Sequence, residues 1–343
     1  MQIHSVGIDL GKTTFHLVAL GDNGKVLLKK KFTQKQLITF TANLQTSLIG
    51  MEACSGAHFL GRALRAQGHD VKLIPAQFVK PFVKSNKNDF LDAEAIAEAV
   101  DRQNMRFVPI KTDDQLDLQA LHRVRERLII RRTSVINQIR SFLLERGIVF
   151  AKSPIRLREA IPEVLENANE NLTPRMRNLV AMLWDEWKDL ELQIVEMNDE
   201  VERIASSDAA CVRLRQIPGV GPLVATAIVA SIGNGAAFKK GREFAAWMGL
   251  VPKQHSTGGK AKLYGISKRG NRYLRKILIH GARAVVLRSK RERIAMGAWL
   301  TALETRAPRN VLIVAMANKL ARITWAVLST GQDYRAIPNA IVA

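Results

Sequence analysis

Four carboxylates in the first hundred residues have the types and spacing of a metal-dependent phosphodiesterase site. Asp9 stands in GIDLGK and Glu52 in LIGMEA, while Asp89 and Asp92 lie three residues apart in NDFLDAEAIAEA. The first two each end an apolar run of strand length, where a charge is costly to bury unless it binds something positive. Carboxylates suit Mg²⁺ or Mn²⁺, and such cations polarise a phosphodiester for cleavage. We therefore predict that the four acids are catalytic metal ligands.

The elements around these acids follow the order of an RNase H-like fold. Turn signals separate strands expected over 3–10, 14–20 and 25–32, and a helix over 34–44 leads to a strand over 47–53. A helix stopped by a glycine, a strand in VKLIPA and a helix opening near Asn88 complete the order βββαβαβα. Two acids three apart share one helix face and can point at the sheet edge that carries Asp9 and Glu52.

Other interpretations of these acids carry less weight. Singly, Glu52 could form a salt bridge and Asp89 could cap its helix, but the joint placement favours a site. The segment GIDLGKTTFHLV also resembles the first phosphate-binding turn of the actin, hexokinase and heat-shock chaperone ATPases, whose DxGGGT turn and adenosine motif this sequence lacks. Four further aspartates lack the placement and are expected as surface charges: Asp101, Asp113, Asp114 and Asp117.

The charge of the chain favours a polyanionic partner. The 343 residues have a formal net charge of +21 and a hydrophobic content of 47%, which is ordinary for a globular protein. Residues 238–293 hold 16 Lys and Arg against 2 Asp and Glu, which is two thirds of the surplus. Neutralising phosphates releases counterions, so this concentration predicts nucleic-acid binding.

The cellular setting is expected to be the bacterial cytoplasm, close to nucleoid DNA. Cys54 and Cys211 are too few and too scattered for a disulfide framework or a cysteine-rich zinc site. The beginning, MQIHSVGIDL, lacks the regions of a signal peptide, and we expect no apolar stretch of membrane-spanning length. The sequence thus predicts a soluble protein without a membrane partner.

A heptad pattern predicts a coiled-coil arm over 113–207, between an α/β domain over 1–112 and a mainly helical domain over 208–335. Apolar residues recur at alternating steps of four and three from Met176 to Ile204, and an earlier stripe from Leu121 to Phe142 is expected to pair with it antiparallel across a proline-containing link. An intramolecular hairpin and self-association are equally compatible with the heptads, and a solvated structural arm is a third possibility.

The third region combines a helix-hairpin-helix pattern with a basic, glycine-rich segment. In IPGVGPLVATAIVASIG, the turn at Gly219 and Gly221 can aim backbone N–H groups at a phosphate, although it could also simply join two packed helices. Tyr264 and Tyr273 are available for stacking in the segment that follows. The residues expected to contact nucleic acid there are Lys260, Lys262, Lys268, Arg269, Arg272 and Arg275, with Lys276 beside them.

Ser256, in KQHSTGGK, is a candidate nucleophile. A serine that attacked a phosphodiester would keep the energy of the broken bond in a phosphoserine ester and allow rejoining without ATP, but a serine in a glycine-rich loop is usually a turn residue. His255 beside it could act as a base, but sequence neighbours often point apart, so it receives no role.

Together these motifs resemble the DEDD transposases of the insertion sequence 110 family, described as bridge-RNA-guided recombinases. GIDLGK, GMEA and NDFLDAEAIA resemble the RuvC-like half of that family. IPGVGPLVATAIVA, AAWMGLVPKQHSTGGK and LYGISKRGNRYLRKIL resemble its C-terminal half. The resemblance extends from the first residue to about Tyr334.

The resemblance implies roles for the residues already singled out. Asp9, Glu52, Asp89 and Asp92 would be the Mg²⁺ ligands, and Ser256 would attack DNA and hold it covalently, with Thr257 as the alternative hydroxyl. A structured guide RNA would pair with donor and target DNA, and the protein would act as a dimer or tetramer. A junction-resolving nuclease would use the same acids but hydrolyse DNA with water. A non-catalytic nucleic-acid binder is a third class, which would explain the positive charge but not the carboxylates.

Overall fold

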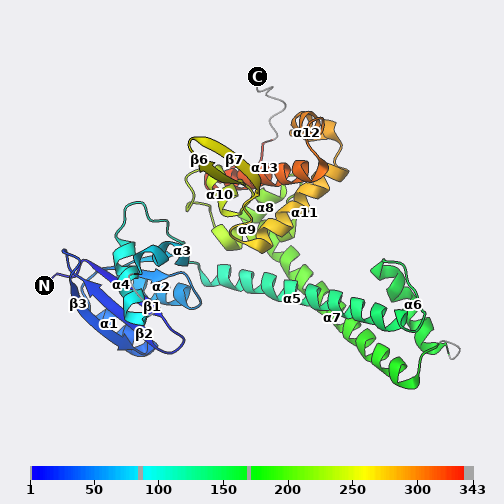
Figure 1. The fold of residues 1–343 in the computed structure, drawn as a ribbon, viewed down its shortest axis with the longest axis horizontal. Coiled ribbons are helices and arrows are strands. Elements are labelled where there is room, and N and C mark those ends of the chain that lie inside the picture. Colours follow the sequence, from blue (N-terminus) through cyan, green and yellow to red (C-terminus); the bar gives the residue numbers. More distant parts are fainter. Residues whose placement is uncertain (1, 84–87, 168–170, 336–343) are drawn as a thin grey trace. The chain divides into compact units, whose positions relative to one another are not determined.

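The computed structural model describes residues 2–83, 88–167 and 171–335, which form two compact units, Met1–Asp113 and Asp114–Ala343 (Figure 1). Each unit has its own buried apolar core. The expected division into three domains stays a prediction.

The first unit contains a mixed five-stranded sheet with helices (Figure 1). Its strands lie in the order β3-β2-β1-β4-β5, with β1 antiparallel to β2 and parallel to β4. They are β1 (Ser5–Leu10), β2 (Phe15–Leu20), β3 (Val26–Phe32), β4 (Leu48–Glu52) and β5 (Asp70–Ile74). The helices are α1 (Gln34–Ala42), α2 (Ala57–Ala66), α3 (Ala76–Val79), η1 (Lys80–Phe82) and α4 (Asp89–Val100). This order confirms the predicted α/β domain and is consistent with an RNase H-like fold; only the short α3 and η1 were not expected.

Helix α4 lies unusually close to β1 because small residues meet there. A Cβ on Gly7 would lie 2.0 Å from the carbonyl oxygen of Ala93 and 2.5 Å from the amide nitrogen of Ala97. The Ser5 hydroxyl donates to the Ala97 carbonyl at 2.9 Å. Gly50 of β4 likewise has no room for a side chain against Ile96. Glycines in two adjacent strands thus set the distance between α4 and the sheet.

The second unit begins with three helices, α5 (Asp113–Leu144), α6 (Pro154–Glu166) and α7 (Pro174–Ser207). Helices α5 and α7 run antiparallel (Figure 1). They bury one apolar seam, to which Ile139 of α5 and Trp187 of α7 belong. The stretch between them, expected as a plain link, contains α6, whose Leu157 and Ile161 join this seam. The α5 and α7 stripes therefore pack within one chain, while supercoiling and self-association stay predictions.

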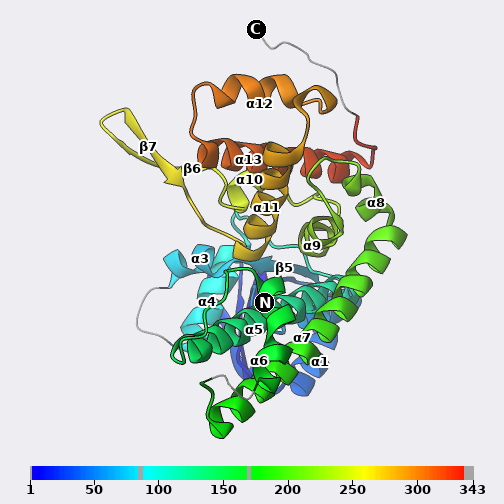
Figure 2. The same cartoon turned by 90° about the vertical axis from the view of Figure 1, so that its right-hand side faces the viewer.

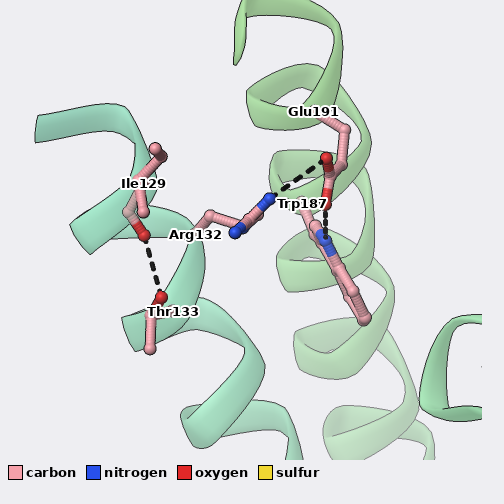
Figure 3. Close-up of polar contacts among 5 residues, drawn as sticks. All are labelled: Ile129, Arg132, Thr133, Trp187 and Glu191. Carbon is pink, nitrogen blue, oxygen red and sulfur yellow. Dashed lines mark hydrogen bonds and ion pairs between the residues drawn. The ribbon is translucent and has the colours of Figure 1, made fainter. Parts of the chain in front are cut away.

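A polar contact crosses this seam at Trp187. Its indole Nε1 donates to Glu191 Oε1 at 3.0 Å, and Arg132 of α5 reaches the same carboxylate at 3.4 Å (Figure 3). Thr133, on the next position of α5, bonds instead to the carbonyl of Ile129 in its own helix. Because a buried indole N–H needs an acceptor, Glu191 allows tryptophan to fill the seam.

The remainder of the second unit is mainly helical, as predicted, and carries one two-stranded hairpin (Figure 2). The hairpin consists of β6 (Pro252–Thr257) and β7 (Lys260–Ile266). The helices are α8 (Ala209–Arg215), α9 (Pro222–Ile232), α10 (Gly241–Trp247), α11 (Arg272–Arg288), η2 (Arg291–Arg293), α12 (Gly297–Glu304) and α13 (Arg309–Thr330). They bury a common apolar core.

Helix α13 corrects one expectation from the sequence. Among the described helices it alone is long and apolar enough to cross a membrane by length and composition. Half of its apolar window is buried inside the fold, and Leu312, Met316 and Leu320 belong to the core of the second unit. A core helix passes the same test, so α13 is weak evidence for a membrane span.

Candidate active site

The strand order brings Asp9 and Glu52 to the same end of two adjacent strands. Strands β1 and β4 are parallel with Ile8 opposite Met51, so the acid that follows each of these residues leaves the sheet at a shared edge. Both side chains are partly exposed. Ends of parallel strands are where open α/β sheets place their ligands, and this geometry follows from the predicted topology.

The other two acids approach this edge from the first turn of α4. Asn88 caps the helix by accepting a hydrogen bond from the amide of Phe90 at 2.9 Å, so Asp89 and Asp92 lie where the helix dipole favours negative charge. The cap belongs to Asn88, which leaves the Asp89 carboxylate available. Lys29 of β3 holds the next turn through Glu94 at 3.0 Å.

Two of the carboxylates, Asp9 and Glu52, are affected by burial and by the charges of neighbouring acids. Burial raises the pKa of Asp9, and the negative charges of Asp92 and Asp89 raise it further. Burial also raises the pKa of Glu52, with smaller contributions from Asp9 and Asp92. Negative charge nearby therefore opposes ionisation of Asp9 and Glu52, and a bound cation would favour it.

Carboxylates are the donor type that Mg²⁺ prefers, but the described structure does not gather three of these acids around one point. Among the described residues, no three His, Cys, Asp or Glu side chains lie close enough to enclose an ion. Mg²⁺ usually takes one or two carboxylates and completes its octahedron with water and substrate phosphates. Asp and Glu are suitable ligands by their chemistry, and the role of these four acids stays a prediction.

His16 is a neighbour of this site that sequence reasoning missed. It lies opposite Asp9 in the β1–β2 register, and its Nδ1 is 3.6 Å from Asp89 Oδ2, beyond hydrogen-bond range. Its ring meets Phe90 edge-on at 4.7 Å. His16 lowers the pKa of Asp9, so its effect is opposite to that of Asp89 and Asp92. The alternation of β2 could have placed His16 on one face, but only the strand pairing sets it beside Asp9.

The four surface aspartates behave as expected. Asp101, Asp113, Asp114 and Asp117 are all exposed. Asp101 pairs with His4 at 3.0 Å, and Asp113 pairs with Arg62.

The segment around Ser256 is a β-hairpin rather than the expected loop. Strands β6 and β7 are joined by Gly258 and Gly259, whose φ angles of +56° and +77° suit a two-residue turn that requires positive φ at both positions. Ser256 is exposed, and its Oγ accepts a hydrogen bond from the Gln254 amide at 2.7 Å. The hairpin projects from the helices of the second unit (Figure 2).

The hairpin separates Ser256 from its sequence neighbours. Successive side chains of a strand point to opposite faces, so His255 and Thr257 lie on the face opposite Ser256. His255 packs edge-on against Tyr264 at 5.5 Å between ring centroids, and the Lys262 ammonium lies over the same ring. His255 is therefore not placed as a base for Ser256, and only one of the two hydroxyls can face a given strand of DNA.

The predicted basic contacts differ in exposure. Lys260, Lys262, Lys268, Arg269 and Arg272 are exposed. Arg275 is buried, and its guanidinium donates to the carbonyls of Met248 and Arg269 at 3.0 and 2.8 Å. These bonds fix the turn that presents Lys268, so Arg275 has a clear positioning role while its contact with nucleic acid stays a prediction.

Two further residues are used by the fold. Tyr273 was expected to be available for stacking, but its hydroxyl is hydrogen-bonded to Nδ1 of the buried His122 at 3.0 Å. The other ring nitrogen of His122, Nε2, is hydrogen-bonded to the Thr226 hydroxyl at 3.1 Å. Lys276 pairs with Glu126. Burial raises the pKa of Tyr273 to about 12. The network joins α5, α9 and α11 inside the second unit.

The two glycines of the predicted helix-hairpin-helix turn differ. Gly219 has φ of +88°, and a Cβ there would lie 2.9 Å from the Gly281 carbonyl, so it permits close packing on α11. Gly221 faces open space and precedes α9. Packing explains why residue 219 is a glycine, and binding of phosphate at Gly219 and Gly221 stays a prediction.

Comparisons with known proteins match both units. Residues 6–147 match the family model of the DEDD transposases of IS110 type, and residues 211–296 match the transposase IS116/IS110/IS902 family. A probable family 20 transposase of Pseudomonas aeruginosa is 43% identical over 98% of this chain and 99% of its own length. The chain belongs to the IS110/IS116/IS902 family of transposases. The transposase is also similar to the transposase for insertion sequence element IS1111A of Coxiella burnetii, with 42% identity over 97% of this chain and 92% of the relative. It is likewise 42% identical to the transposase for insertion sequence element IS1328 of Yersinia enterocolitica, over 95% of this chain and 97% of the relative.

Family membership confirms the resemblance found in the sequence and establishes the activity in outline. The transposase binds DNA and cleaves and transfers its strands to move an insertion sequence. Its matched DEDD domain implies the use of a divalent metal in general terms.

Proposed function

We propose that the transposase cleaves and rejoins DNA with Asp9, Glu52, Asp89 and Asp92 as Mg²⁺ ligands and Ser256 as nucleophile. The observation that carries the metal assignment is the parallel register of β1 and β4, which brings Asp9 and Glu52 to the same end of two adjacent strands. Asp89 and Asp92 lie in the first turn of α4, which packs on β1. A cation bound there would stabilise the negative charge that develops on the phosphate and on the leaving oxygen. The acids would hold it, and α4 would keep Asp89 and Asp92 against that edge.

Ser256 would do the covalent chemistry. Its Oγ would form a bond to phosphorus as one phosphorus–oxygen bond to deoxyribose breaks, and the serine proton would end on the departing sugar oxygen. Attack by a deoxyribose hydroxyl on the phosphoserine would reverse the exchange and join a new end. Exposure at a glycine turn gives the hydroxyl access to a DNA strand.

Denaturing gels with labelled DNA test both assignments. Asp92→Ala should abolish cleavage and leave DNA binding unchanged, whereas Asp117→Ala, an exposed aspartate on α5, should cleave normally. Ser256→Ala should remove the protein–DNA adduct, and Thr257→Ala on the other hairpin face should keep it. An adduct that survives Ser256→Ala and disappears with Thr257→Ala would move the nucleophile to Thr257.

A second candidate is hydrolysis by water in the manner of a junction-resolving nuclease. It is favoured by one observation: the hydrogen bond of Ser256 comes from the amide of Gln254 and not from a base. In that case cleavage would need the same acids, but the cut DNA would enter the denaturing gel free of protein in the wild type.

We also propose a structured guide RNA, a dimer or tetramer, and a cytoplasmic location in bacteria. The concentration of positive charge over 238–293 supports a nucleic-acid partner there, and the guide itself is carried over from the resemblance. Sequencing of RNA that co-purifies with the transposase tests the guide. Light scattering on the purified protein, with and without that RNA, tests the oligomer.

A further inference from the structure

A cavity at the base of the β6–β7 hairpin is lined mostly by residues that have no role in the proposed chemistry, together with Tyr264, which the sequence offered for stacking. It has a volume of about 1290 Å³ and lies between α13, the beginning of α10, Trp299 of α12 and the hairpin base at Pro252 and Ile266. Figure 2 shows these elements together in the second unit. The site differs from the predicted basic contacts, which lie farther along the hairpin and on the loop after it.

The charged side chains that line this cavity favour the binding of an anion. Lys240, Arg242, Lys319 and Arg322 line it, and no acidic side chain belongs to its described wall. None of these four cations forms an ion pair with a carboxylate in the part of the chain that the structure describes. Burial, and then the charge of Arg322, lower the pKa of Lys319, so an anion would relieve this crowding.

The aromatic side chains that line the cavity favour the binding of flat apolar groups. Trp299 and Trp325 are partly buried, and the Lys319 ammonium lies 4.2 Å from the centroid of the Trp299 ring. On α13 the wall includes apolar Val311, Val314 and Ala315 together with the amides of Asn310 and Asn318, and Val311 is 53% exposed. A phosphate alone has no need of indole rings, and a duplex keeps its bases stacked inside. Cations beside aromatic faces are the arrangement that binds unpaired nucleotides.

We propose that this cavity binds an unpaired nucleotide of single-stranded DNA next to the strand presented to Ser256. The inference rests on the proposed function for its geometry, because Ser256 lies four residues along β6 from Pro252, about 13 Å at 3.3 Å per residue. A base held by Trp299 would keep the DNA strand from sliding, and Lys319 and Arg322 would hold its phosphates.

Binding of the full-length transposase to single-stranded DNA tests the inference directly. The probe is a labelled oligonucleotide with one 2-aminopurine, compared with a blunt duplex and an RNA of the same sequence. Trp299→Ala and Arg322→Glu should each weaken single-strand binding about tenfold, and Trp299→Ala should remove the quenching of 2-aminopurine. Duplex binding should change less than about twofold.

The arm supplies a matched control. Lys188 lies over the ring of Trp184 on α7, the same type of pair as Lys319 and Trp299 but outside the cavity. Lys188→Ala should leave single-strand affinity unchanged, whereas Lys319→Ala should lower it. Thermal unfolding of each variant separates lost binding from lost folding, and exposed Arg322 can be changed without disturbing the core.

Several results would overturn the inference. Equal single-strand affinity of wild type and folded Arg322→Glu would do so, as would tighter binding of RNA than of DNA at this cavity. A change of oligomeric state in Arg322→Glu without a change in affinity would assign the cavity to a second copy. None of these results alters the dependence of cleavage on Asp92 or of the adduct on Ser256, so the proposed function can fail or stand independently.

Discussion

Gly7→Ala should damage cleavage through the packing of α4 on the sheet. The added Cβ would lie 2.0 Å from the Ala93 carbonyl oxygen, where an ordinary contact needs about 3.4 Å, so α4 must retreat by about 1.4 Å. Overpacking of this kind costs about 1–3 kcal/mol. Asp89 and Asp92 move with α4 while Asp9 stays on β1, and a misplacement of about 1 Å can cost about a hundredfold in rate.

The assay for Gly7→Ala is metal-dependent cleavage of labelled DNA, with thermal unfolding and DNA binding measured on the same protein. We expect a Tm lower by roughly 4–12 °C, cleavage reduced about a hundredfold and binding retained. Gly21→Ala is the control, because its Cβ would meet only the flexible Leu27 side chain at 3.2 Å. Cleavage by a folded Gly7→Ala at the wild-type rate would refute the view that this contact positions the acids.

Three further changes test other parts of the structure. Burial lowers the pKa of His122 to about 4 from its ordinary 6.5. Between these two pH values the unfolded chain binds a proton that the folded chain does not, so the free energy of unfolding should fall by about 3 kcal/mol as the pH drops from 6.5 to 4. His122→Gln should flatten this pH dependence in urea titrations. Glu191→Leu leaves the buried Trp187 N–H without its acceptor and should cost about 1–3 kcal/mol in thermal unfolding; an unchanged Tm would contradict this. Gly259→Val forces a branched residue to positive φ at the hairpin tip and should reduce adduct yield in denaturing gels, while Tm stays unchanged because the hairpin is exposed.

The hairpin around Ser256 follows from a local signal in the sequence. Two adjacent glycines between alternating strands are a strong local signal for a two-residue turn, and KQHSTGGKAKLY contains that signal. Instead, the density of glycine and lysine favoured a loop. With the hairpin in place, the alternation of faces separates Ser256 from His255, a distinction that no count of residues could make.

The arm illustrates a different limit. The heptads of α7 identified its buried face, and Trp187, Leu190 and Ile194 lie in the seam as the pattern predicts. On α5 the seam uses Leu143 where Phe142 was expected, and α6 fills part of the interhelical link. Periodicity specifies which face of a helix is apolar, but the identity of the partner depends on packing between segments distant in sequence.

The sequence by itself determined the order of strands and helices, the positions of the acids at strand and helix ends, and the membership of the family. These follow from local rules, because alternation, turn residues and motif spacing act over a few neighbours. Only the tertiary structure decided that Gly7 and Gly50 set the distance between α4 and the sheet, and that His16 lies opposite Asp9. It also decided that the Arg275 guanidinium donates its hydrogen bonds to backbone carbonyls. Each of these depends on close contact between segments far apart in the chain, where differences of about 1 Å decide whether a side chain fits.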